Sequence, residues 1–164
     1  MSKIKKEYKM LLAIILILVI IDQILKFIVL KNNNLVLIDG ILKFSIYENT
    51  NGTYGVDSNS TIMYVLTNII IIVIAFQFIT SQNQFVDKKI KMFLSLIIAG
   101  GISNSIDRIF RGYVVEFIDF TELIKLPIFN FADIYILIGW VSMVAIFAAF
   151  TAKELKNRKS VKKE

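Results

Sequence analysis

Four long apolar stretches constrain the fold of this chain more than any other feature of its sequence. They fall at residues 9–30, 61–80, 90–110 and 131–152, and residues 69–74 read Ile-Ile-Ile-Ile-Val-Ile. A helix needs about 20 predominantly apolar residues to cross the hydrocarbon core of a bilayer. Hydrophobic residues make up 56% of the 164 residues, more than a water-soluble domain usually carries. We therefore expect a mostly α-helical membrane protein with four transmembrane helices, forming a single membrane domain over residues 1–164.

The positions of the basic residues predict how the chain is oriented. Four lysines lie between residues 3 and 9, three between 88 and 91, and six basic residues between 153 and 163. Positive charges beside short membrane-flanking segments mark the cytoplasmic side. Both termini are therefore expected in the cytoplasm, with outer segments at 31–60 and 111–130 and a frayed cytoplasmic tail at 153–164. Because the net charge of +6 lies beside apolar segments, no nucleic-acid partner is expected.

The first apolar stretch allows a second interpretation. The lysine-rich residues 1–9 and the apolar residues 10–21 resemble the first two regions of a secretory signal peptide. However, no small-x-small cleavage site follows, and the apolar pattern continues to Leu30. An uncleaved membrane span is the preferred interpretation.

The outer segments have strand-like patterns. Residues 35–38 and 41–47 are rich in Leu, Val, Ile and aromatic residues and flank the turn dipeptide Asp39-Gly40. Residues 49–55 are typical of a loop, and residues 113–120 alternate in part as a strand does. These patterns predict a small β-rich platform outside the membrane.

Carboxylates near the ends of three apolar stretches are the candidate functional groups. Asp22 lies in the outer half of the first span, Asp107 near the outer end of the third and Asp133 at the start of the fourth. An ionisable group at membrane depth is costly and usually faces the bundle interior, which makes it a functional-site hypothesis. The chain has no Cys and no His, so thiolate and imidazole chemistry are excluded. Two facing carboxylates can share one proton and carry out acid–base chemistry without a metal or cofactor.

Each of these polar residues also has a purely structural interpretation. Asp22 and Lys26 are four residues apart and can neutralise each other within one helix. Asn130 can cap the fourth helix, and the helix dipole alone favours Asp133 in its first turn. Arg108 can extend to the membrane interface or pair with the carboxylate beside it. Their joint occurrence at one depth favours a functional site.

Three motifs in these regions resemble those of the lipoprotein signal peptidases (type II signal peptidases) of bacteria, and the resemblance covers nearly the whole chain. The motif D-Q-x-x-K matches Asp22, Gln23 and Lys26. A glycine pair at residues 100–101 followed by N-x-x-D-R matches Asn104, Asp107 and Arg108, and F-N-x-A-D matches Asn130, Ala132 and Asp133. The resemblance implies that Asp107 and Asp133 form the catalytic pair. The other matched residues would support the site or bind substrate. The same supporting role is implied for four residues of two further blocks, Asn49, Gly52, Tyr54 and Glu116.

The resemblance also implies an activity, substrate and location. The expected protein is an aspartic-type endopeptidase of the bacterial cytoplasmic membrane, acting near its outer face. Its partners would be the bilayer and prolipoproteins whose Cys carries diacylglyceryl, with cleavage just before that Cys. Inhibition by globomycin-type peptides is implied as well. No cofactor and no metal are expected, and a four-helix bundle with an interior site is expected to act as a monomer.

The sequence departs from the family pattern at a few positions. The family's N-x-G-A-A-[FW] block keeps Asn49 and the aromatic Tyr54, but G-A-A is replaced by a stretch that includes Gly52. The usual V-V-D-F is here V-V-E-F with Glu116, and Ser103 stands where Gly commonly precedes the motif Asn. These departures suggest a divergent, active member with altered substrate or inhibitor preference.

Two other functions are compatible with the sequence. A diverged paralogue could bind lipoproteins or inhibitors without cleaving them, which the altered residues 51–53 would motivate. A proton-coupled transporter could use the intramembrane aspartates. The absence of an inverted repeat argues against the transporter.

Overall fold

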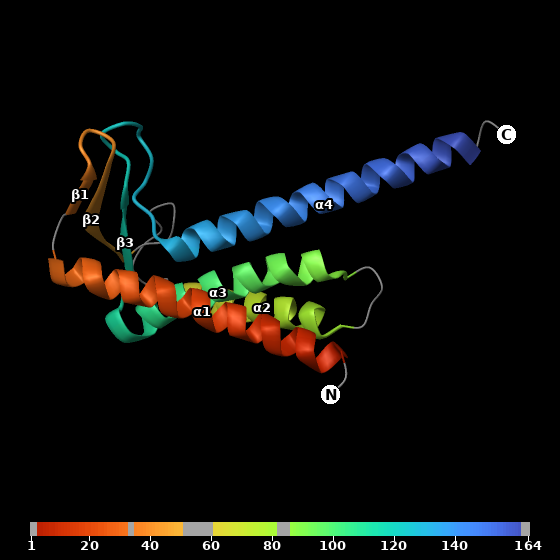
Figure 1. Ribbon diagram of the computed structural model, residues 1–164, viewed down its shortest axis with the longest axis horizontal. Helices are drawn as coiled ribbons and strands as arrows, with labels where there is room; N and C mark the ends of the chain where they lie inside the picture. Colours follow the sequence, from red (N-terminus) through yellow and green to blue (C-terminus); the bar gives the residue numbers. More distant parts are fainter. Residues whose placement is uncertain (1–2, 33–34, 51–60, 82–85, 162–164) are drawn as a thin grey trace.

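The computed structural model describes residues 3–32, 35–50, 61–81 and 86–161. Its helices are α1 Lys3–Asn32, α2 Thr61–Thr80, α3 Lys88–Arg111 and α4 Phe131–Val161. All four are long and apolar enough to cross a membrane. The predicted fold class of a mostly helical membrane protein with four spans is therefore confirmed. The helices alternate in direction, so α1 and α3 end where α4 begins (Figure 1).

Two helices are longer than the apolar windows that predicted them. Helix α1 begins at residue 3 rather than 9, and α4 continues to residue 161, so most of the predicted frayed tail is helical. The apolar window measures only the length in hydrocarbon, whereas helix length depends on breakers and helix formers. No Gly or Pro follows Gly139, and residues 152–159 are rich in Ala, Lys, Glu, Leu and Arg. The helix therefore continues beyond the predicted span.

The ends of α3 are set by local capping residues. At its start, the Asp87 side chain accepts a hydrogen bond of 2.9 Å from the backbone N–H of Ile90. At its end, Gly112 adopts a left-handed conformation with φ of 82° and donates its N–H to the Arg108 carbonyl. Such a glycine ends a helix because it lacks the Cβ that strains this conformation. The chain then turns directly into the third strand.

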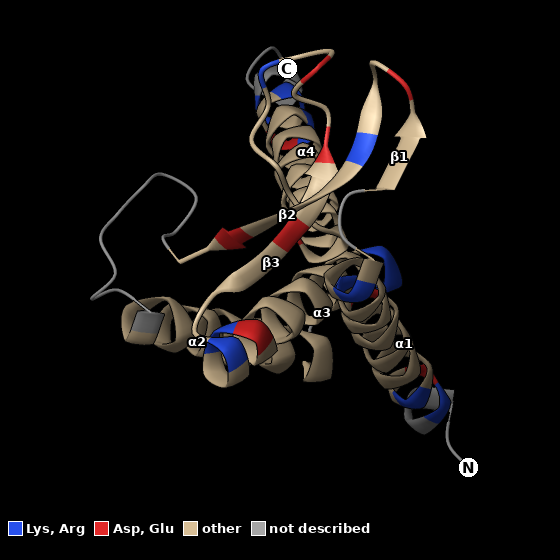
Figure 2. Ribbon diagram, turned by 90° about the vertical axis from the view of Figure 1, so that its left-hand side faces the viewer, with Lys and Arg blue, Asp and Glu red and all other residues tan. Residues whose placement is uncertain are grey.

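A three-stranded antiparallel sheet lies at one end of the bundle. Its strands are β1 Leu35–Ile38, β2 Leu42–Asn49 and β3 Val114–Asp119, in the order β1-β2-β3. The sheet lies across the ends of the helices when viewed along them (Figure 2). The predicted strands and the turn at Asp39-Gly40 are present, with Gly40 at φ 68°.

Strand β3 is more buried than its partly alternating sequence predicted. All six of its residues are buried. One edge pairs with β2, and the other pairs with Phe129, whose carbonyl accepts from the N–H groups of Phe117 and Ile118. On the side of the strand that faces the helices, Phe117 packs with Val29 of α1 and with Phe131 at the start of α4. The platform is therefore fixed to the helices through this strand.

Helix α3 is the central element of the bundle. It packs against each of the other three helices, and its most apolar window is 61% buried, compared with 6% for α4. The polar residues of α3 consequently face protein, while large apolar side chains of α1, α2 and α4 are exposed on the outside. This arrangement is the one expected of a bundle surrounded by lipid.

Two glycines allow α3 and α4 to lie close together. A Cβ at Gly100 would meet the Ala132 carbonyl oxygen and lie 2.6 Å from Cγ1 of Ile136. A Cβ at Gly139 would lie 2.8 Å from the Phe93 carbonyl oxygen. Small residues permit such close helix contacts in membranes. The contact at Gly100 brings the start of α4 against the polar part of α3.

Replacing Gly100 by Ala is therefore expected to destabilise the protein. The new methyl group meets backbone at Ala132, so α3 and α4 must separate, at a cost of about 1–3 kcal/mol. Thermal unfolding in detergent measures the loss. The matched control is Gly101→Ala, whose Cβ would lie 3.5 Å from Ile72, an ordinary contact. Equal melting temperatures for the two variants would contradict the close-packing account.

Candidate active site

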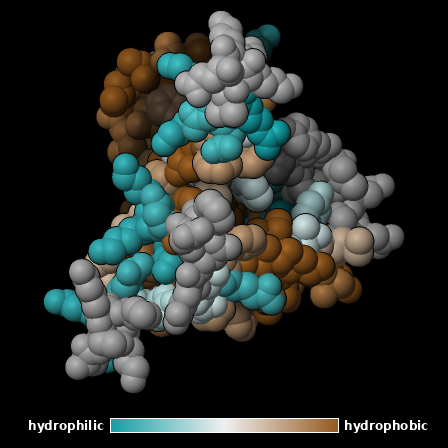
Figure 3. Space-filling model, turned by 90° about the vertical axis from the view of Figure 1, so that its right-hand side faces the viewer, coloured by the Kyte–Doolittle hydropathy of each residue, from teal (hydrophilic) through white to brown (hydrophobic). Residues whose placement is uncertain are grey.

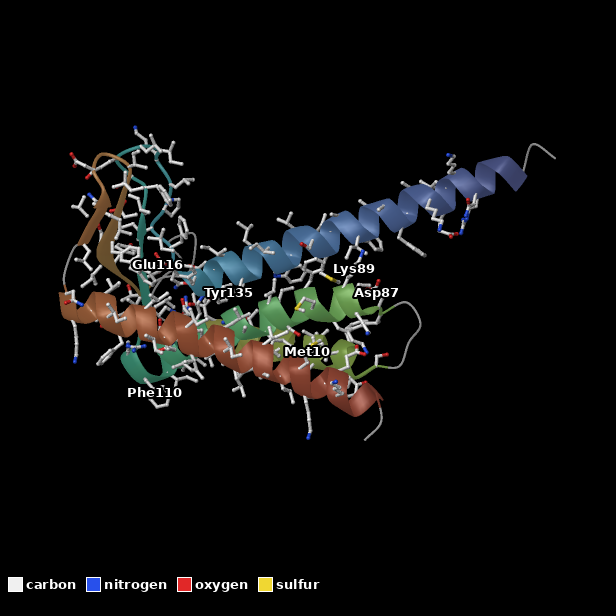
Figure 4. The ribbon with its side chains drawn as sticks, in the orientation of Figure 1. Met10, Asp87, Lys89, Phe110, Glu116 and Tyr135 are labelled. Atoms are coloured by element: carbon white, nitrogen blue, oxygen red, sulfur yellow. The ribbon has the colours of Figure 1, made fainter. Side chains whose placement is uncertain are left out.

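Polar side chains gather where α1 and α3 end, α4 begins and the sheet covers the bundle. Figure 4 shows Glu116 on β3 beside the first turns of α4, near Tyr135. Asp87 and Lys89 lie at the opposite end of the bundle in the same view, and Phe110 points away from it. The site is therefore enclosed by three helices and one strand.

Lys26 lies at the centre of the polar cluster. Its side chain is fully buried, and Nζ lies 2.7 Å from Asp22 Oδ2, 2.8 Å from Asp107 Oδ2 and 3.1 Å from Asn104 Oδ1. The ion pair with Asp22 considered from the sequence is present. It is not self-contained, because the same ammonium group also joins α1 to α3.

Asp107 is completely buried and fully occupied by hydrogen-bond donors. Its Oδ1 accepts from Gln23 Nε2 at 3.0 Å and pairs with Arg111. Its Oδ2 pairs with Lys26 and accepts from the backbone N–H of Val115 at 3.1 Å. Two cations and two further N–H donors therefore occupy both oxygens of this carboxylate.

Asp22 links α1 to both α3 and α4. Its Oδ2 accepts from the Ser103 hydroxyl at 2.6 Å, and its Oδ1 accepts from the backbone N–H of Ala132 at 3.1 Å. The second contact satisfies one of the free N–H groups at the start of α4. The departure from the family pattern at Ser103 thus supplies an additional hydrogen bond to this network.

Asn130 and Asp133 form the start of α4. The Asn130 side chain accepts from the N–H of Asp133 at 2.9 Å, and Asp133 Oδ2 accepts from the N–H of Asn130 at 3.1 Å. This reciprocal arrangement is a capping box, so the capping role considered for Asn130 is present. Asp133 Oδ1 accepts from Asn104 Nδ2 at 2.8 Å. Unlike Asp107, Asp133 is only partly buried and has no cation in hydrogen-bond contact among the described residues.

Glu116, like Asp133, is a carboxyl group that no cation contacts among the described residues. It is 9% exposed, and its Oε1 accepts from Asn49 Nδ2 at 2.6 Å. The pKa of Glu116 is raised to about 7, chiefly by burial and also by the charge of nearby Asp133, although the hydrogen bond from Asn49 and the charges of Arg108 and Lys26 lower it. Within the described part of the chain it forms no salt bridge. Glu116 can therefore hold a proton near neutral pH.

Arg108 is positioned by an aromatic ring. Its guanidinium carbon lies 4.9 Å from the centre of the Tyr64 ring on α2. The arginine that pairs with Asp107 is Arg111 instead, one helical turn further along α3. The sequence interpretation missed Arg111, although its spacing of four residues from Asp107 is the signal that predicts such a pair.

The expected catalytic pair, Asp107 and Asp133, have different surroundings in the structure. Both aspartates belong to one network, as their common depth predicted, but Asp107 is enclosed by Lys26 and Arg111. Glu116 instead lies close enough to Asp133 for their charges to interact and carries the raised pKa. The family resemblance implies only a supporting role for Glu116.

Other expected features are only partly described. Gly52 and Tyr54 of the altered motif lie outside the described residues, whereas Asn49 at the end of β2 contacts Glu116. Within the described ranges, the acidic residues form no group of three that would hold a metal ion.

The raised pKa of Glu116 predicts how the free energy of unfolding depends on pH. The folded protein binds this proton up to about pH 7, whereas an ordinary glutamate releases it near 4.5. Stability should therefore fall as pH rises from about 4.5 to about 7, by on the order of 3 kcal/mol from this group. Thermal unfolding of wild type and Glu116→Gln across this range measures the difference. Parallel curves for the two proteins would contradict the raised pKa.

This chain is similar to a known protein family and to solved structures. The family described as signal peptidase (SPase) II matches residues 14–150. A lipoprotein signal peptidase of Haemophilus ducreyi is 40% identical over 93 residues, 56% of each chain, and one of Borrelia duttonii is 36% identical over 109 residues, 62% of each chain. The matched part thus spans less than two thirds of these relatives. A solved bacterial membrane enzyme has a TM-score of 0.80 at 27% identity, covering 88% of this chain and 91% of that one. Because the family match extends over most of its length, this chain belongs to the signal peptidase II family.

Proposed function

We propose that this protein removes the signal peptide from diacylglyceryl-modified prolipoproteins, cutting just before the lipidated Cys. The observation that carries this proposal is the pair of carboxyl groups of Glu116 on β3 and Asp133 in the first turn of α4. One of them is held by N–H donors and the other has a pKa near 7. Membership of the signal peptidase II family and the names of the relatives support the substrate class.

The two carboxyl groups have different roles in the proposed reaction. Asp133 as carboxylate takes a proton from water, whose oxygen then attacks the scissile carbonyl carbon. Protonated Glu116 donates a hydrogen bond to the carbonyl oxygen and stabilises the developing charge. The tetrahedral intermediate collapses when the C–N bond breaks and the leaving nitrogen receives the proton from Asp133. No covalent enzyme intermediate is required, as in other proteases with two acidic residues.

Asp107 positions Glu116 in this account. Its Oδ2 holds the N–H of Val115, and Asn130 Nδ2 donates to the carbonyl of the same residue at 3.1 Å. Both backbone groups of Val115 are therefore fixed by the polar network, immediately before Glu116. Contacts of this kind determine where a side chain leaves its strand and thus keep the acid near its partner.

The distribution of charge supports an orientation with both termini in the cytoplasm of the bacterial cell. The end of the molecule that carries the termini has hydrophilic side chains over part of its face beside apolar surface (Figure 3). Exposed lysines lie there on α1 and α3, and the α4 extension is basic. Positive residues favour the cytoplasmic side. The proposed site then lies near the outer face, where the acyl chains of a lipidated substrate can stay in the bilayer.

Substitution of either carboxyl group is expected to abolish cleavage. We expect Glu116→Gln and Asp133→Asn to reduce product formation at least about 10³-fold, as loss of an essential acid or base does, with normal insertion. Glu116→Asp keeps a carboxyl group and should retain measurable activity. The assay follows shortening of a purified diacylglyceryl-modified precursor, with a globomycin-type peptide as the inhibited control.

The same assay separates the proposal from its alternatives. Wild-type turnover by Glu116→Gln would restore Asp107 as the partner of Asp133. Binding of the precursor by wild type without a shortened product would instead show a non-enzymatic binder. For an active wild type, cleavage should decline as pH rises above about 7, since Glu116 must be protonated.

A further inference from the structure

We infer that Lys26 is a positioning residue: it fixes the orientation of the Asn104 amide and thereby makes Asp133 the ionised member of the carboxyl pair. The inference rests on the proposed function, because it concerns how that pair is prepared for catalysis. Lys26 itself lies on α1 and touches Asp22, Asp107 and Asn104.

Every donor of the Lys26 ammonium group has an acceptor. An ammonium group has three N–H donors and no acceptor. The three atoms around Nζ are Asp22 Oδ2, Asp107 Oδ2 and Asn104 Oδ1, at 2.7 to 3.1 Å. The group of Asn104 that faces Lys26 must therefore be an oxygen.

The Asn104 amide consequently has one permitted orientation. Its Oδ1 accepts from Lys26 and also from Asn130 Nδ2 at 3.1 Å. A flipped amide would place its NH₂ group against an ammonium group and a second NH₂ group, and both contacts would lack an acceptor. With the oxygen turned toward Lys26, Nδ2 faces Asp133 and donates at 2.8 Å.

This orientation determines which carboxyl group is ionised. Asp133 accepts from Asn104 at Oδ1 and from the Asn130 backbone at Oδ2, so both oxygens receive N–H donors. Hydrogen bonds donated to a carboxylate favour its charged form. Glu116 accepts one such bond, from Asn49, within the described residues. We therefore assign the proton of the pair to Glu116 and the role of base to Asp133.

Two matched double variants test whether Lys26 acts through Asn104. Asp22→Asn/Lys26→Met and Asp22→Asn/Lys26→Gln remove the same charges and leave Asp107 paired with Arg111. Met and Gln are similar in size, but only Gln can donate to Asn104 Oδ1. The readout is the acidic limb of the kcat/KM profile with the diacylglyceryl-modified precursor.

The Met variant should move the acidic limb to higher pH by about one unit, the size expected for a weakened hydrogen bond to a charged group. The Gln variant should keep the limb within a few tenths of a unit of wild type. Equal shifts in both variants would overturn the inference, because Lys26 would then act through its charge alone. An unshifted limb in the Met variant would overturn it as well.

Asn104→Leu provides a test that does not depend on folding of the Lys26 variants. It leaves Lys26 and its two carboxylates in place but removes the donor to Asp133. We expect the same shift of about one unit, and an unshifted limb would overturn the inference. Failure of wild type to cleave the precursor would overturn the proposed function, whereas cleavage with an unmoved limb overturns only the role of Lys26.

Discussion

The buried ammonium group of Lys26 is the interaction on which the rest of the site depends. A lysine with no solvent exposure is costly unless opposite charges and acceptors surround it. Asp22 and Asp107 supply the charges, and Asn104 supplies the remaining acceptor. Because these groups come from α1 and α3, neutralising the lysine also fixes the relative position of the two helices. Removing one partner alone would leave a charge buried without compensation.

The start of α4 is built onto this charged cluster. Gly100 allows close approach, Asp22 accepts from the Ala132 backbone, and Asn104 contacts both Asn130 and Asp133. A helix start normally leaves free N–H groups that need partners. Here Asp22 of α1 accepts from the N–H of Ala132, and Asn130 and Asp133 accept from each other's N–H groups. The structural role of Asp133 in its capping box is therefore compatible with its proposed role as a base.

The sequence predicted the four spans, and it pointed to polar residues on three helices that the structure brings together. Apolar length and basic flanks are local signals, and Asp22, Asp107 and Asp133 do meet in one network. The sequence did not predict which carboxyl groups lie outside hydrogen-bond contact with a cation. That distinction depends on Arg111 and Val115, which occupy Asp107, and on the burial of β3, which places Glu116. Glu116 lies on a strand outside the apolar windows, and the family resemblance implies only a supporting role for it.

The central claim is that Glu116 holds the proton of the carboxyl pair at neutral pH. The most direct measurement is a ¹³C NMR titration of protein labelled at the glutamate side-chain carboxyl carbon, with Glu116→Gln used to assign the resonance. The account predicts a midpoint at about pH 7 for this group. A midpoint near the ordinary glutamate value of 4.5 would contradict it.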